Sequence, residues 1–287
     1  MKIKIGTRKS KLALAQTSMV IERLHALFPS IETEIVHIST KGDKILDSPL
    51  SEIGGKGVFV SEIEKALQSG TIDIAVHSAK DLPVQLGEDL EISGVLERGS
   101  YSDVLVTSVG HHADKNEKII VGTGSLRRRI NLKKIYPNAV FKDIRGNIDT
   151  RLKKLADGEY DSIILAKAGL ERLGLYGSEN FSFMEFDHEE FLPAPCQGII
   201  AIEGRTNDVF TPIIHRISDT DTFYCFESER HVLQLLGADC TMPVGALAYI
   251  SDDKIHLTVS KDCANIISGE TVISQRIRLA EELAAKL

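Results

Sequence analysis

The chain of 287 residues contains no tryptophan, and aromatic residues make up only 6% of it. It has no apolar run near the ~18–20 residues that a membrane span needs, and its first ten residues lack the apolar core of a signal peptide. These absences argue against a membrane partner. We therefore expect a cytoplasmic protein.

Cysteine is scarce and irregularly spaced, at Cys196, Cys225, Cys240 and Cys263. This spacing fits neither a disulfide framework nor a CxxC metal site, so free thiols and no metal are expected. Cys225 falls in a helical pattern and is interpreted as core filling. The other three lie in predicted loops, where a reactant can reach a thiol, and the pattern does not choose among them.

An excess of basic residues is also missing, because 34 Lys and Arg face 41 Asp and Glu, a net charge of −7. A nucleic-acid partner is therefore not expected, since such proteins need a broad positive footprint. The arginines are nevertheless concentrated at 127–129, with Arg145 and Arg151 following. This concentration indicates a local pocket for a small polyanion.

The length suggests two or three domains, and 43% apolar and 26% charged residues are ordinary for globular proteins. The first stretch alternates strand and helix patterns, an order that favours a mainly parallel sheet. The expected elements are strands at 3–6, 32–39 and 72–77 and helices at 11–28 and 59–67. In the first helix, the apolar residues near one face are Leu12, Ala15, Met19 and Leu27.

A second α/β unit begins near Ser100, and a small α+β domain with an antiparallel sheet ends the chain. The segment 180–198 breaks the pattern and is interpreted as the return of the chain to the first unit. Strands are expected at 104–107, 119–122, 140–143, 162–166, 244–250, 255–260 and 266–273, and helices from Ser125, Ile148 and Asp219 and at the C-terminus. The predicted domains are 1–97 with 199–216, 98–198, and 217–287.

Several of the loops after predicted strands carry residues that could bind an anion. Lys80 and Asp81 follow the strand at 72–77, at the carboxyl end where open α/β sheets place ligands, although a plain turn with a solvated ion pair is the alternative. Arg8 and Ser10 follow the first strand in the same way. Lys56 lies in a glycine-rich turn, but Gly57 stands where a nucleotide phosphate loop needs a hydroxyl residue, which excludes that site.

The segment 123–128 opens a helix directly after a strand, so backbone N–H groups, the Ser125 hydroxyl, Arg127 and Arg128 could converge on an anion. A serine N-cap with solvated arginines is the other interpretation. The segment 144–151 repeats the design, with Arg145 and Gly146 at a strand end and Arg151 in the next helix. Two such loops at one sheet edge favour a carboxylate or phosphate site.

The order and spacing of VHSAKDLP (76–83), GSLRRR (124–129), IRGNIDTR (144–151) and the loop around Cys240 resemble the hydroxymethylbilane synthase, or porphobilinogen deaminase, family over essentially the whole chain. The resemblance implies two α/β domains like periplasmic binding proteins, a central cleft, and a third α+β domain that carries the cysteine. It also implies a monomeric transferase of tetrapyrrole (haem) biosynthesis. In this family, four porphobilinogen molecules are condensed with loss of ammonia onto a dipyrromethane primer, and hydrolysis releases linear hydroxymethylbilane.

The resemblance further implies a role for individual residues. Asp81 matches the catalytic carboxylate, and Cys240 matches the thiol that holds dipyrromethane as a thioether. Residues expected to contact the cofactor are Cys240, Lys80, Ser125, Arg127, Arg128, Arg145, Gly146 and Lys56. Residues expected to contact the substrate are Arg8, Ser10, Arg145, Arg151, Arg172 and Gln197.

Three positions depart from the family pattern, and they concern local loop contacts. Glu52 stands where some relatives carry lysine, and Pro195-Cys196 and Ala238-Asp239 replace smaller residues. The competing hypothesis is a two-domain protein that binds a small polyanion without catalysis.

Overall fold

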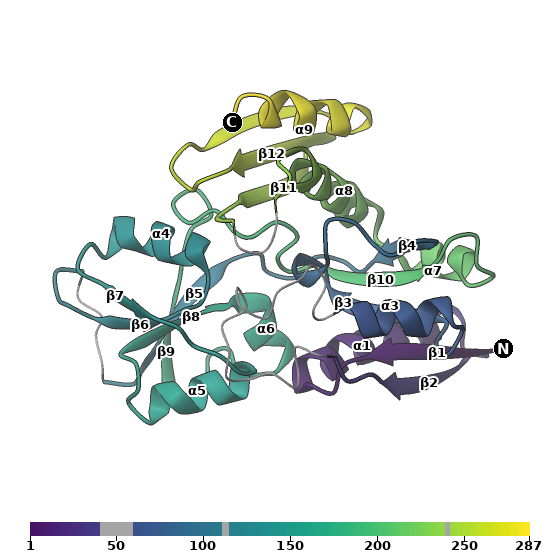
Figure 1. The fold of residues 1–287 in the computed structure, drawn as a ribbon, viewed down its shortest axis with the longest axis horizontal. Coiled ribbons are helices and arrows are strands. Elements are labelled where there is room, and N and C mark those ends of the chain that lie inside the picture. The colour runs from purple at the N-terminus through teal and green to yellow at the C-terminus, as the bar shows by residue number, and fades with distance from the viewer. Residues whose placement is uncertain (41–59, 111–114, 239–241) are drawn as a thin grey trace. The chain divides into compact units, whose positions relative to one another are not determined.

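The structure is a computed structural model that describes residues 1–40, 60–110, 115–238 and 242–287 (Figure 1). No helix in this described part is both long and apolar enough to cross a membrane. Predicted site and departure residues that lie outside the described residues are Lys56, Cys240, Glu52 and Asp239.

The chain divides into two compact units. One consists of Met1–Arg98 and Ile199–Glu227, and the other consists of Gly99–Gly198 and Ser228–Leu287. Each unit is therefore built from two separate stretches of sequence. The division into three domains with a central cleft stays a prediction.

The first unit contains a five-stranded sheet in the order β2-β1-β3-β10-β4. β1 pairs in parallel with β2 and β3, whereas β10 is antiparallel to both β3 and β4. The mainly parallel sheet is thus confirmed, with one antiparallel strand supplied by the second pass of the chain. The strands are β1 (Lys2–Thr7), β2 (Glu32–His37), β3 (Ile74–Ser78), β4 (Leu90–Val95) and β10 (Ile200–Arg205).

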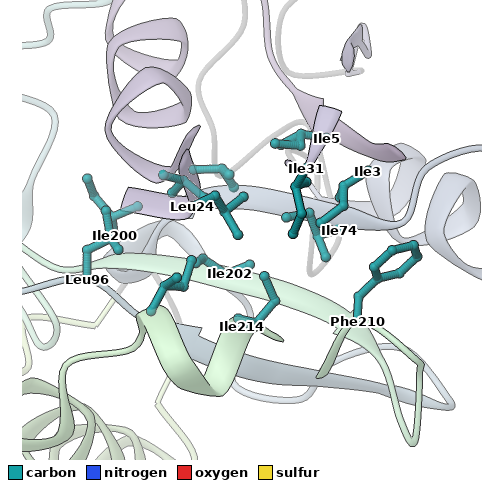
Figure 2. Close-up of a cluster of buried hydrophobic side chains, with 13 residues drawn as sticks. Ile3, Ile5, Leu24, Ile31, Ile74, Leu96, Ile200, Ile202, Phe210 and Ile214 are labelled. Atoms are coloured by element: carbon teal, nitrogen blue, oxygen red, sulfur yellow. The ribbon is translucent and has the colours of Figure 1, made fainter. Parts of the chain in front are cut away.

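The core of this unit follows from the alternation of side chains along the strands. Ile3, Ile74 and Ile202 project from three neighbouring strands into one cluster of buried side chains (Figure 2). Helices α1 (Lys11–Leu27) and α7 (Thr211–Ile217) supply the other side of this cluster. On the opposite face, α3 (Ser61–Gln68) packs with Ile63 and Leu67 fully buried.

The buried face of α1 differs from the one predicted. Met19 and Leu27 are exposed, while the buried residues are Gln16, Thr17, Val20 and Leu24. The two polar side chains are accommodated because each forms a hydrogen bond. Gln16 Nε2 donates to Ser78 Oγ at 2.8 Å, and Thr17 Oγ1 donates to Ala13 O at 2.9 Å.

The second unit contains a five-stranded sheet in the order β7-β6-β8-β5-β9. β6 is parallel to β7 and β8, and β5 is antiparallel to β8 and β9, the same pattern of directions as in the first sheet. The strands are β5 (Asp103–Ser108), β6 (Ile120–Gly122), β7 (Val140–Lys142), β8 (Ser162–Ala166) and β9 (Phe181–Glu185). The helices between them are α4 (Leu126–Ile135), α5 (Ile148–Ala156) and α6 (Lys167–Arg172).

The segment 180–198, in which no strand was predicted, begins with the strand β9. Phe181 and Phe183 are half-buried and alternate with the exposed Ser182 and Met184. A period of two over five residues is enough for an edge strand, although the polar and proline-rich residues after it hide the pattern. The remainder, residues 186–198, is called the return segment below.

The last part of the chain forms an antiparallel sheet in the order β11-β12-β13. Its strands are β11 (Gly245–Ser251), β12 (Lys254–Ser260) and β13 (Ile267–Val272), and its helices are α8 (Thr220–Leu235) and α9 (Arg276–Ala284). The predicted α+β ending and the α/β class of the chain are confirmed.

Candidate active site

The predicted binding loops follow the carboxyl ends of parallel strands in both sheets. In the first unit, Arg8 and Ser10 follow β1, and Asp81 follows β3. In the second unit, Ser125 follows β6 and Arg145 follows β7. Because the carboxyl ends of parallel strands lie at one edge of a sheet, each unit gathers its own binding residues at one edge.

At the edge of the first sheet, Ser10 caps helix α1, and its Oγ accepts a hydrogen bond from the backbone N of Ala13 at 3.2 Å. Arg8 is half-buried beside it. The N-terminal turn of a helix thus stands next to a guanidinium group, an arrangement that attracts anions.

Asp81 lies in a short 3₁₀ helix, η1 (Ala79–Asp81), directly after β3. The backbone N of Ala79 donates to Ile199 O at 3.0 Å, which ties this turn to the neighbouring strand. Asp81 is exposed and Lys80 is half-buried. An exposed carboxylate on an anchored turn can meet a ligand without first breaking contacts within the protein.

Arg127 and Arg128 in the first turn of α4 are buried, with 4% and 8% of their surfaces exposed. Both bind Asp103, which is fully buried at the start of β5. Arg127 Nη2 lies 2.7 Å from Asp103 Oδ2, and Arg128 Nη2 and Nε lie 2.6 Å and 3.0 Å from Oδ1. These arginines are therefore not solvated.

Gln197 joins the same group, because its Nε2 lies 3.2 Å from Asp103 Oδ1 and 2.8 Å from Tyr101 O. The sequence predicts Gln197 as a site residue, but Asp103 was not among the predicted residues. Asp103 stands directly before the apolar run 104–106. Because a carboxylate at the start of a buried strand needs cationic partners, this position indicated a buried ion pair.

Arg127, Arg128 and Asp103 bring two positive charges and one negative charge into a buried place. Because the carboxylate balances only one guanidinium, the three side chains together carry one excess positive charge. A buried unbalanced cation is costly and favours a bound anion. The residues at this edge thus fit a ligand that carries carboxylates, as dipyrromethane does with its acetate and propionate groups.

The loop between β6 and α4 is held by side chains that return to its backbone. Ser125 is the N-cap of α4, and its Oγ accepts from the backbone N of Arg128 at 3.4 Å. Arg129 donates to Thr123 O at 2.9 Å and pairs with Asp143 at 2.5 Å. The third arginine of the run therefore fixes the loop and binds a carboxylate of the protein itself.

The second arginine loop has a different environment. Gly146 adopts a φ of 105°, and a Cβ there would lie 2.7 Å from Cγ2 of Thr150. Arg151 Nε donates to Gly146 O at 2.7 Å. Arg145 is half-buried and makes no side-chain hydrogen bond or ion pair within the described part of the chain. Its charge is available to a ligand.

Arg172 ends helix α6, after β8, and its Nη2 donates to Gly198 O at 2.5 Å. Burial lowers the pKa of Arg172 to about 10. The side chain still carries its charge at neutral pH, so it also suits a carboxylate.

Three of the four cysteines are buried: Cys196, Cys225 and Cys263. The core position of Cys225 is confirmed. The Cys263 thiol donates to Pro243 O at 3.0 Å, and burial raises its pKa from 9.0 to about 11, which suppresses the reactive thiolate. Cys196 and Cys263 are thus poor anchors for a ligand, in contrast to the expectation from their loop positions.

The sequence of this chain is similar to those of known proteins. A family model described as "Porphobilinogen deaminase, dipyromethane cofactor binding domain" matches residues 3–211. The "Probable porphobilinogen deaminase" of Methanocaldococcus jannaschii is 42% identical over 297 residues, covering 99% of both chains. The porphobilinogen deaminase of Listeria innocua is 41% identical and covers 100% of this chain and 94% of its own.

Among solved structures, the periplasmic VFT2 domain of BvgS from Bordetella pertussis covers 75% of this chain and 86% of its own, with a TM-score of 0.45 and 14% identity. The matches in sequence extend over both units and include every loop described above. The chain therefore belongs to the porphobilinogen deaminase family.

Proposed function

We propose that this protein is a hydroxymethylbilane synthase. It condenses four porphobilinogen molecules head to tail, releases one ammonia for each, and hydrolyses the product to linear hydroxymethylbilane. The observation that carries the proposal is the 42% identity over 99% of the chain to the relative named "Probable porphobilinogen deaminase", an alternative name for this activity. A monomeric state and a cytoplasmic location belong to the same proposal.

The arginines bind the carboxylates of the cofactor and the growing chain. Each pyrrole carries an acetate and a propionate, so six rings bring about a dozen negative charges, which require many cationic partners. Arg145 offers a guanidinium that has no partner among the described residues, and Arg127, Arg128 and Asp103 together carry one net positive charge. Lys80, Arg151 and Arg172 supply further positive charges at the same sheet edges.

Asp81 supplies a carboxylate at the pyrrole N–H groups. Each condensation places positive charge on a pyrrole that must then lose a proton, and a carboxylate beside the ring nitrogens offsets that charge and accepts the proton. The exposure of Asp81 on the anchored turn after β3 supports this role.

Cys240 is proposed as the anchor because it matches the thiol that holds dipyrromethane in the family, and the burial of Cys196, Cys225 and Cys263 supports this proposal. When bound there through a thioether, dipyrromethane supplies the terminal pyrrole to which new units are added. Buried thiols would have to open the core to carry it.

Incubation with porphobilinogen, followed by absorbance of the oxidised tetrapyrrole, tests the activity. Intact mass should exceed the sequence mass by two condensed pyrroles, and the extra mass should map to Cys240 and be absent in Cys240→Ser. Ligand binding without turnover would favour the non-catalytic binding protein. An adduct at Cys196 or Cys263 would refute the assignment of the anchor.

The role of Asp81 is tested by Asp81→Asn in protein whose cofactor content has been checked by mass. Loss of a positioned acid–base group should lower turnover by ~10²–10⁴. Asp81→Glu keeps the charge and should be milder. Glu88→Gln, at an exposed position in the loop that follows, is the control and should retain wild-type turnover. If cofactor-loaded Asp81→Asn turns over within a few-fold of wild type, Asp81 is only a residue of the turn and not the catalytic carboxylate.

A further inference from the structure

We infer that Asp103 is the positioning residue of the cofactor and substrate site, an inference that rests on the proposed function. Asp103 is fully buried, and its carboxylate accepts hydrogen bonds from three side chains. All three, Arg127, Arg128 and Gln197, are expected to contact cofactor or substrate. One carboxylate thus sets the orientation of three proposed ligand-binding groups.

The three partners come from two different parts of the second unit. Arg127 and Arg128 stand on α4, and Gln197 stands on the return segment. Each guanidinium is also held at its far side by a backbone carbonyl. Arg127 Nη1 donates to Leu192 O at 2.7 Å, and Arg128 Nη1 donates to Ile164 O at 3.0 Å. With Asp103 between them, neither arginine can turn without breaking contacts at two sites.

Only a carboxylate satisfies all of these donors at once. Oδ2 accepts from Arg127, while Oδ1 accepts from Arg128 and from Gln197. In an asparagine, one of the two acceptor atoms becomes an NH₂ donor that faces another donor, whichever way the amide is turned. The variant Asp103→Asn therefore loses at least one arginine contact while it keeps its size.

The same carboxylate sets the charge of the site. Without Asp103, the two buried guanidinium groups would lose the carboxylate that both of them bind. With it, one positive charge remains for the ligand. Asp103 thus holds the arginines at a fixed separation and prevents their mutual repulsion from opening the site.

The experiment compares wild type, Asp103→Asn and Asp103→Glu for the fraction of protein that carries the two-pyrrole mass, and for KM and kcat of the loaded fraction. Displaced arginines bind carboxylates less well, so Asp103→Asn should carry the adduct in a fraction at least ~10-fold lower, as loss of one charge-assisted contact predicts. Its loaded fraction should show a raised KM with little change in kcat. Asp103→Glu keeps the charge and should lie between the two.

Asp161→Asn is the matched control, because Asp161 accepts a hydrogen bond from the backbone N of Ile120 at 2.6 Å in the same sheet. It removes a charge, keeps an amide oxygen that can accept from Ile120 N, and touches no proposed binding residue, so it should keep wild-type loading and KM. Circular dichroism verifies that each variant is folded.

Folded Asp103→Asn with wild-type loading and KM would overturn the inference. If Asp103→Asn does not fold, Asp103→Glu decides: a raised KM supports the positioning role, and a wild-type KM overturns it. A wild-type protein with neither adduct nor turnover would contradict the proposed function instead. Calorimetric titration with succinate, a dicarboxylate probe, then tests the inference alone, since weaker binding by the Asp103 variants supports it and equal binding overturns it.

Discussion

The two arginine loops of the second unit look alike in sequence and differ in the structure. In the loop after β6, Arg127 and Arg128 are buried and bound to Asp103. In the loop after β7, Arg145 is half-buried and has no side-chain partner among the described residues, and Arg151 bonds to the backbone of its own loop. The first loop is therefore part of the core, and the second is a surface that can receive a ligand.

This difference shows that one pattern of residues can serve two physical purposes. A guanidinium that is already bound to a buried carboxylate contributes to stability as well as to binding. An unpaired guanidinium contributes to binding alone, because surface charges have little effect on the free energy of unfolding. Variants of the two loops should accordingly separate stability from cofactor retention.

The largest expected effect is the loss of stability in Arg128→Met. The substitution keeps much of the apolar volume but removes two hydrogen bonds to Asp103 and one to Ile164 O. Loss of these three hydrogen bonds from a buried charged group should lower the free energy of unfolding by about 3–5 kcal/mol, although Arg127 still balances the charge of Asp103. Urea unfolding measures this loss of free energy, provided that the m-value is the same in the variant and in wild type. A loss below about 1 kcal/mol would mean that the first loop resembles the second.

The next effect concerns Gly146→Ala in the second loop. The positive φ and the close approach of Thr150 should together cost about 2–3 kcal/mol. Gly158→Ala is the control, because Gly158 has a φ of 77° with no heavy atom within 4 Å of a Cβ, so it should lose only about 1 kcal/mol. Thermal unfolding compares the two. Equal losses would show that contact with Thr150 does not matter.

A smaller effect, dependent on pH, comes from Cys263, whose thiol lies 3.9 Å from Arg127 O in the first loop. Burial raises the pKa of this thiol from 9.0 to about 11. The folded state then holds a proton that the unfolded state releases, so the stability is fully present below pH 9 and declines as the pH rises through 11. The decline should reach about 2 kcal/mol near pH 10.5.

Unfolding measured at pH 8 and pH 10.5 tests this dependence, and Cys263→Ala should flatten it. The same decline in Cys263→Ala and in wild type would assign the alkaline sensitivity to other groups.

The smallest effect on stability is expected for Arg145→Ala, within about 0.5 kcal/mol of wild type. Its loss of a carboxylate contact should nevertheless lower cofactor loading or turnover by ~10–100-fold. Lys142→Ala removes an exposed cation at the end of the same strand and serves as the control for net charge. Normal loading and turnover in Arg145→Ala would show that the free guanidinium is merely solvated.

The sequence predicted most elements because their periodicity is local. The strand Ser162–Ala166 has the predicted bounds, and helix α4 begins after the Ser125 cap. It missed β9, where only two phenylalanines carry the alternation, and misplaced the buried face of α1, where Gln16 is buried because Ser78 accepts its hydrogen bond. In both cases the structure depends on a partner distant in the chain, because β9 pairs with β5 and Gln16 bonds to Ser78.

The sequence by itself determined the α/β class, the family and the loops that carry arginine and Asp81, because these depend on residue type, order and spacing along the chain. Only the tertiary structure decided that Arg127 and Arg128 bind a carboxylate while Arg145 has no side-chain partner among the described residues. Asp103 lies 24 residues from Arg127 along the chain, and folding brings their charged atoms to 2.7 Å. The cost of burying a charge makes a cationic partner necessary, and the apolar residues after Asp103 signal that need, but the local sequence does not say which residues supply it.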